Sequence, residues 1–142
     1  MKLIPQLKQE HVEIMRSFAS IKEGVVGGKV GDADLIKELR ELKNTLVAHL
    51  DLEDKMLYSA LAKSETVEAK ELGEKYSVEM LGISKIALTF FEKYMSDAIA
   101  DLLKSAEFRK ELDGVISAVT KRVEAEETIL YPVYEKCCEV SI

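Results

Sequence analysis

Through most of this 142-residue chain, apolar residues recur at spacings of three and four, the period of a helix with one buried face. In the first segment this stripe runs through Leu7, His11, Ile14, Phe18, Ile21 and Val25. None of the long segments shows the strict alternation of a half-buried strand. The pattern therefore predicts a few long amphipathic helices that bury their stripes against one another.

Glycine and serine mark the ends of these segments. The predicted helices cover residues 4–23, 33–62, 66–102 and 106–138. A glycine-rich connection from Gly24 to Asp34 supplies aspartates that can cap the second helix, and Ser105 can cap the fourth. Four such helices with short loops form an all-α, up-down-up-down antiparallel four-helix bundle, which we expect to be a single domain over residues 1–142.

The stripes of the second and fourth predicted helices contain charged side chains. The second-helix stripe is Leu35, Leu39, Leu42, Leu46, His49, Glu53, Met56 and Ala60, and the fourth-helix stripe is Phe108, Leu112, Val115, Val119, Arg122, Glu126, Ile129 and Val133. Together with His11, these stripes place five ionisable residues on faces that should be buried. A buried carboxylate is costly unless it is paired or binds a metal.

The spacing between His49 and Glu53 places an imidazole and a carboxylate one turn apart on the same face of a helix. Together with His11 and Glu126, these residues offer two nitrogens and two carboxylates from three helices. Nitrogen and carboxylate ligands suit iron, manganese or zinc. The competing interpretation is a metal-free polar network in which the histidines pair with the carboxylates.

The chain contains an internal repeat. The stretch "HLDLEDKMLYSAL", which begins at His49, aligns with "RVEAEETILYPVY", which begins at Arg122. In the same way "QEHVEIMRSF" aligns with "VEMLGISKIA". The sequence therefore predicts a duplicated helical hairpin, in whose second copy Met80 stands in the place of His11 and Arg122 in the place of His49.

The stretches "EHVEI", "HLDLEDKMLY" and "EAEETILYP" resemble the hemerythrin-like (HHE cation-binding) family, and the resemblance extends over nearly the whole chain. It implies a four-helix bundle that holds two bridged irons through histidines from all four helices and carboxylates from the second and fourth. By match to the family pattern, the ligand positions that carry over are His11, His49, Glu53 and Glu126.

The chain departs from the family pattern in its second half. Met80 and Arg122 stand where the resemblance implies histidines, and Tyr76 lies one turn before Met80. A thioether is a poor ligand for ferric or divalent iron, and a guanidinium stays protonated. We expect these three residues to line the site, with Tyr76 and Met80 packed in the core and Arg122 directed at Glu126 in place of a second metal ion. Because the chain has only two histidines, reversible oxygen carriage is not expected.

Two repeat-related pairs flank the predicted site. Tyr58 and Tyr131 are expected to cap the bundle core near the ends of the second and fourth helices. Asp54 and Glu127 lie one position off the stripes. We expect these two carboxylates to be solvated, or to support the ligands from outside, rather than to bind a metal.

The sequence therefore predicts a metal-binding protein with a reduced, mononuclear site for iron, zinc or manganese, used in sensing or storage rather than catalysis. Two alternatives stay open at this point. One is a metal-free degenerate bundle that acts as an interaction or dimerisation module. The other is a non-haem iron protein in oxidative or nitrosative stress. A homodimer is compatible with the predicted fold.

Charge and composition argue against several other partners. The formal net charge of −6 disfavours nucleic acid and anionic membrane surfaces, which reward a clustered basic face. No stretch approaches the roughly 18 consecutive apolar residues of a membrane span. We expect a cytoplasmic protein, and we interpret the adjacent Cys137 and Cys138 as reduced thiols, because neighbouring cysteines rarely bridge each other.

Overall fold

The computed structural model describes residues 2–28, 31–94 and 105–138, which are almost entirely helical. The elements are α1 (Leu3–Gly27), α2 (Asp32–Leu52), η1 (Glu53–Tyr58), α3 (Ser59–Ala62), α4 (Val67–Tyr94), α5 (Ala106–Ala125), η3 (Glu126–Leu130) and α6 (Tyr131–Cys137). The elements η1 and η3 are π-helical turns that continue the helices on either side. Each of the runs α2–η1–α3 and α5–η3–α6 is therefore one long helix.

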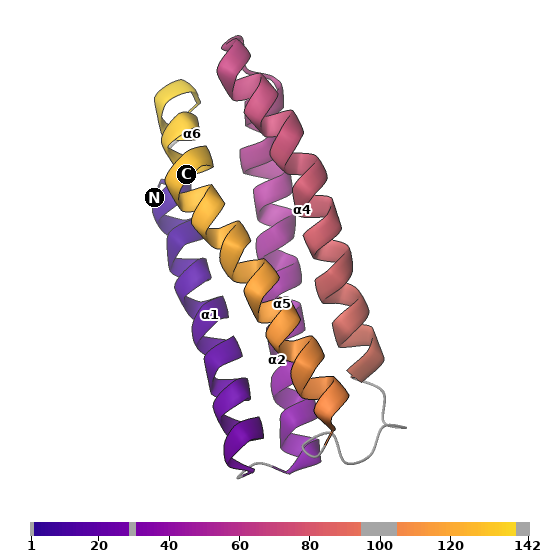
Figure 1. Ribbon diagram of the computed structural model, residues 1–142. Coiled ribbons are helices and arrows are strands. Elements are labelled where there is room, and N and C mark those ends of the chain that lie inside the picture. Colours follow the sequence, from indigo (N-terminus) through magenta and orange to yellow (C-terminus); the bar gives the residue numbers. More distant parts are fainter. Residues whose placement is uncertain (1, 29–30, 95–104, 139–142) are drawn as a thin grey trace.

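The four long helices run alternately up and down and form the predicted bundle (Figure 1). The helix α1 packs against α2 and α5, and α4 also packs against α2 and α5, which closes the ring. The first residues of α1 and the end of α6 lie toward the same end of the bundle (Figure 1). Among the described residues, no helix is long and apolar enough to cross a membrane.

Two apolar clusters fill the bundle, one on each side of a layer of buried charged side chains. The first cluster extends from Ile14 on α1 to Val119 on α5, and the second from Leu3 on α1 to Tyr134 on α6. Every residue of the stripe predicted for α1 is at most 2% exposed. The predicted stripe of the second helix is buried as far as Glu53, so the three-and-four spacing identified the inner faces correctly up to the charged layer.

Beyond the charged layer, the predicted stripes are wrong by one residue. In the second helix the buried residues are Leu57 and Leu61 rather than Met56 and Ala60. The fourth helix is displaced in the same way, and Ile129, which was predicted to be buried, is 39% exposed. The same displacement in two repeat-related helices indicates a common cause in the backbone.

The cause is a π-helical turn in each helix. In η1 the N–H of Ser59 donates to the carbonyl of Asp54, five residues earlier, and in η3 the N–H of Tyr131 donates to the carbonyl of Glu126. A π turn contains one more residue than the α-helix around it, so the residues that follow are displaced by one position. Pro132, which has no N–H, follows directly and marks the irregularity in the sequence.

The helix ends agree with the predictions in part. The helix α1 continues past residue 23 and ends where Gly28 takes a left-handed φ of 61°. The predicted aspartate cap of the second helix is wrong, because the chain enters α2 through an extended Gly31 with no side-chain cap. Ser105 caps α5 as predicted, since its Oγ accepts the N–H of Phe108 at 3.1 Å. The predicted end of the third helix, over residues 95–102, lies outside the described residues.

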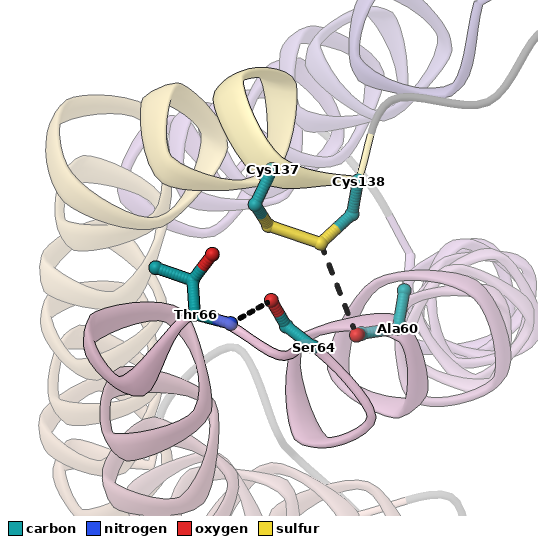
Figure 2. Close-up of a disulfide and its surroundings, with 5 residues drawn as sticks. All are labelled: Ala60, Ser64, Thr66, Cys137 and Cys138. Carbon is teal, nitrogen blue, oxygen red and sulfur yellow. Dashed lines mark hydrogen bonds between the residues drawn. A yellow bond between two sulfur atoms is a disulfide. The ribbon is translucent and has the colours of Figure 1, made fainter.

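Cys137 and Cys138 form a disulfide with each other, so the prediction of reduced thiols is wrong. Cys137 is the last residue of α6, and Cys138 leaves the helical conformation with a φ of −141°, which turns its side chain toward that of its neighbour. Figure 2 shows the pair beside the turn between α3 and α4, where Ser64 Oγ accepts the N–H of Thr66. The sulfur of Cys138 lies 3.9 Å from the carbonyl oxygen of Ala60.

Candidate metal centre

Four side chains from three helices meet in the charged layer between the two apolar clusters. His11 lies on α1 and His49 on α2, while Glu53 and Glu126 are the first residues of η1 and η3. Each side chain offers one donor atom, and the four donor atoms all lie within 4.8 Å of one another. All four residues are at most 4% exposed. The fold thus brings together the four residues that the sequence singled out as ligands.

Carboxylates outside the cluster hold both imidazoles. His49 Nδ1 lies 2.7 Å from Glu10 Oε1, and His11 Nδ1 lies 2.8 Å from Glu127 Oε2. Gln6 donates to the other oxygen of Glu10 at 3.1 Å and helps to orient it. Because an ionised carboxylate can only accept a hydrogen bond, we assign the proton of each neutral imidazole to Nδ1. The Nε2 atoms then face the cluster, as in many metal-binding histidines.

Each Nε2 atom meets a carboxylate oxygen. His11 Nε2 lies 3.2 Å from Glu126 Oε1, and His49 Nε2 lies 3.1 Å from Glu53 Oε1. The two atoms of the second pair are not aligned for a hydrogen bond, and neither has another hydrogen-bond partner among the described residues. A neutral Nε2 and a carboxylate oxygen both present lone pairs and repel each other. The arrangement therefore needs a positive species, either added protons or a metal ion.

Protons meet this need when no metal is bound. Burial by itself lowers the pKa of His49, but the Glu53 and Glu10 carboxylates outweigh burial and raise this pKa to about 9. Burial lowers the pKa of His11, but Glu126, Glu127 and Glu53 together raise it by more, so this pKa is also raised. Burial, followed by the charge of Glu53, raises the pKa of Glu126 to about 8. Burial raises the pKa of Glu53, but its interactions, chiefly those with His49, together lower it by more, so this pKa is lowered. A metal ion at this place would displace the retained protons.

Two tyrosines contact the cluster, which contradicts their predicted place at the ends of the core. Tyr58 donates to Glu126 Oε2 at 2.8 Å, and Tyr131 donates to Glu53 Oε2 at 2.9 Å. The hydroxyl of Tyr131 also lies 3.1 Å from His11 Nε2. The prediction failed because the π turns rotate both tyrosines into the bundle. The available signal was that each tyrosine stands five residues after a repeat-related glutamate.

Arg122, Tyr76 and Met80 lie on one side of the cluster. Arg122 Nε is 3.6 Å from Glu126 Oε2, and its guanidinium carbon lies 5.4 Å and 5.0 Å from the ring centroids of Tyr58 and Tyr76. The cation is thus held beside a carboxylate and two aromatic rings. A cavity of about 20 Å³, enough for about one water molecule, is lined by Arg122, Met80, His49, Ser84 and apolar neighbours.

The contacts of the two halves mirror each other. The two tyrosine–glutamate bonds cross reciprocally from one half of the chain to the other. Glu79, equivalent to Glu10 in the repeat, lies 3.9 Å from Arg122, which is equivalent to His49. The halves are therefore related by approximate two-fold symmetry about the cluster. The symmetry is broken at Arg122 and at Met80, which replaces a second His11.

Comparison with known protein families gave one match. A family model described as the hemerythrin HHE cation binding domain matches residues 2–134. The matched range includes all four residues of the cluster, both π turns and the carboxylates that hold the imidazoles. Comparisons with curated proteins and with solved structures gave no significant match.

Proposed function

Because this chain belongs to the hemerythrin HHE cation-binding family, we propose that it binds a single metal ion through His11 Nε2, His49 Nε2 and the carboxylates of Glu53 and Glu126. Two imidazoles and two carboxylates suit iron, manganese or zinc. The observation that carries the proposal is the opposition of His49 Nε2 and Glu53 Oε1, two buried atoms without a hydrogen bond, which are both acceptors whenever the imidazole is neutral. A bound cation would supply the positive charge that a proton on His49 supplies in the metal-free protein.

Arg122 supports one ion rather than two. It stands in the second half where the repeat places a counterpart of His49, and its Nε lies 3.6 Å from Glu126. A fixed cation at this position neutralises carboxylate charge and repels a second metal ion. The rings of Tyr58 and Tyr76 hold the guanidinium in place.

A role in sensing fits this centre better than storage, because one buried ion per chain is a small store. The ion would link α1 to η1 and η3, so its binding would add to the stability of the bundle. We propose that the chain responds to metal availability through this coupling between metal binding and folding. Glu10 and Glu127, which lie outside the centre, would support metal binding because their hydrogen bonds orient the imidazoles of His49 and His11.

Metal content tests the proposal. Inductively coupled plasma mass spectrometry on protein purified without a histidine tag should find about one iron, zinc or manganese ion per chain. His49→Ala and Glu53→Gln should lose the ion. Asp54→Asn is the matched control and should retain it, because Asp54 neighbours Glu53 in the chain but is exposed. Protein that takes up no metal after reconstitution with iron and zinc, or that keeps its metal in His49→Ala, would contradict the proposal.

A further inference from the structure

The disulfide between Cys137 and Cys138 lies at the end of α6, beside the turn between α3 and α4 (Figure 2). Both cysteines pack against the second apolar cluster, yet both are half-buried rather than enclosed in it. The candidate metal centre uses neither of them. The pair is therefore a separate chemical feature of the chain, and part of it is open to reagents in solvent.

This disulfide contributes little to holding the fold together. A disulfide stabilises a protein mainly by restricting the loop that it closes in the unfolded chain, so its effect grows with the number of residues enclosed. Cys137 and Cys138 are neighbours in the chain, so their bond encloses no other residue. The buried rings of Tyr131 and Tyr134 already anchor α6 in the core. A structural role therefore does not account for the bond.

The surroundings of Cys138 are suited to a thiol as well as to a disulfide. Its sulfur lies 3.9 Å from the carbonyl oxygen of Ala60, but a disulfide sulfur has no proton to donate. A thiol is a weak hydrogen-bond donor and can use this oxygen. Ala60 lies in the last turn of α3, and the N–H groups of residues 63 and 64 donate to the carbonyls on either side of it. Reduction would therefore give a carbonyl at a helix end a donor.

We propose that Cys137 and Cys138 form a reversible redox site that exchanges two electrons with low-molecular-weight thiols of the glutathione class. A thiolate attacks one sulfur, the bond between the cysteines breaks, and a mixed disulfide forms. The other cysteine leaves as a thiolate and takes up a proton. A second thiolate then attacks the sulfur of the small molecule in the mixed disulfide, which releases the first cysteine and forms the disulfide of the small molecule. Two small thiols are oxidised, and one protein disulfide is reduced.

The adjacency of the two cysteines favours the return reaction. When a small disulfide reacts with one thiol of the reduced pair, it leaves a mixed disulfide on that cysteine. The neighbouring thiol is tethered beside this bond, so it displaces the small molecule in a step within one chain. The pair can close again without bringing two separate elements together.

A redox titration of the full chain tests the proposal. The protein is equilibrated in a series of buffers with graded ratios of reduced to oxidised glutathione, and its free thiols are counted by maleimide labelling and mass spectrometry. The folded protein should change reversibly from no labelled thiol to two per chain within this series. A structural disulfide resists reduction by glutathione and would stay closed. Circular dichroism on the same samples should show a folded bundle at both ends of the series.

Serine variants serve as controls. In Cys138→Ser, oxidised glutathione should leave a stable mixed disulfide on Cys137, because no neighbouring thiol remains to displace the small molecule. Reduced wild-type protein should bind one phenylarsine oxide per chain, since this probe bridges two adjacent thiols, and Cys138→Ser should not retain it. The variant Cys137→Ser/Cys138→Ser places a hydroxyl donor near Ala60 and should melt close to the temperature of the wild type.

Three results would overturn the proposal. The first is a disulfide that stays closed in the folded protein throughout the glutathione series. The second is a bundle that unfolds when the pair is reduced or replaced by serines, which would make the bond structural. The third is a reduced pair that oxidised glutathione does not close again. The metal proposal does not depend on the outcome, because it uses different residues.

Discussion

The position of single protons determines what the cluster can bind. Glu10 and Glu127 each accept an Nδ1–H group, so that in the neutral imidazoles both Nε2 lone pairs are directed at the carboxylates inside. If the outer carboxylates were absent, either nitrogen of each imidazole could carry the proton. The outer contacts are therefore as important to the proposed centre as the four inner donors.

The first prediction concerns Glu10. Glu10→Gln keeps the shape of the side chain but removes the charge that holds the proton on His49 Nδ1, so metal affinity should fall by about tenfold or more. Competition with a chromophoric chelator measures the change. Glu13→Gln is the control, since Glu13 is exposed on the same helix. Equal affinities for the two variants would show that Glu10 does not orient the imidazole.

The second prediction concerns pH. The folded pKa values of His49, about 9, and Glu126, about 8, both exceed their ordinary values of 6.5 and 4.5. The folded metal-free protein therefore binds more protons than the unfolded chain between roughly pH 5 and 9, and its free energy of unfolding falls as the pH rises through this range. The pKa of Glu53 is lowered from 4.5, so the free energy of unfolding that its ionised form contributes is lost only as the pH falls below this ordinary value.

Bound metal replaces these protons, so the metal-loaded protein should lose less stability as the pH rises. The difference in melting temperature between loaded and metal-free protein should widen from pH 6.5 to 9, as followed by circular dichroism. His49→Gln should reduce the pH dependence of the metal-free protein. A difference that narrows over this range would contradict the proton assignment.

At the scale of the elements, periodicity predicted the helices well on one side of the charged layer and failed on the other. Spacings of three and four locate a buried stripe only while the helix keeps its period, and a π turn restarts the stripe one position later. The periodicity therefore placed His49 and Glu53 correctly on the buried face, but it placed Met56 there instead of Leu57. For the same reason it missed Tyr58 as a partner of the cluster.

The third prediction contrasts two helical glycines. A Cβ on Gly73 would lie 2.7 Å from the Cβ of Leu61, so Gly73→Ala would force α3 and α4 apart. We expect a loss of about 1–3 kcal/mol in the free energy of unfolding. Gly114→Ala meets open space and should stabilise α5 by up to about 1 kcal/mol. Urea denaturation measures both, and a stabilising Gly73→Ala would contradict the close packing of these helices.

At the scale of the whole molecule, the bundle consists of two similar hairpins that share one polar centre. The sequence revealed this repeat, but only the fold shows that most of the surroundings of a second histidine pair are still present. Glu79 already lies near Arg122, as Glu10 lies near His49. Asp54, the counterpart of Glu127 in the repeat, lines a surface groove together with Met80.

The fourth prediction follows from this symmetry. The double variant Met80→His/Arg122→His supplies the two missing imidazoles and removes the fixed cation, so metal content should rise from about one ion to about two per chain. Mass spectrometry of the intact protein under native conditions measures the change. Met80→His alone keeps the arginine and should stay at one ion. A folded double variant with an unchanged metal content would show that the second position cannot be restored in this way.

The two π turns also determine where this chain can lose a residue. In a regular α-helix, deletion of one residue rotates everything beyond it by about 100° and exposes the core. Deletion of the exposed Lys55 would instead turn η1 into an ordinary α-helical turn, and Leu57 and Leu61 would keep their buried positions. The shortened chain should still fold with Glu53 and Tyr58 beside the centre, as its thermal unfolding and its metal content would show. A single deletion should thus be tolerated at this one turn, whereas the same deletion in the middle of α2 would turn the residues beyond it away from the core and abolish both folding and metal binding.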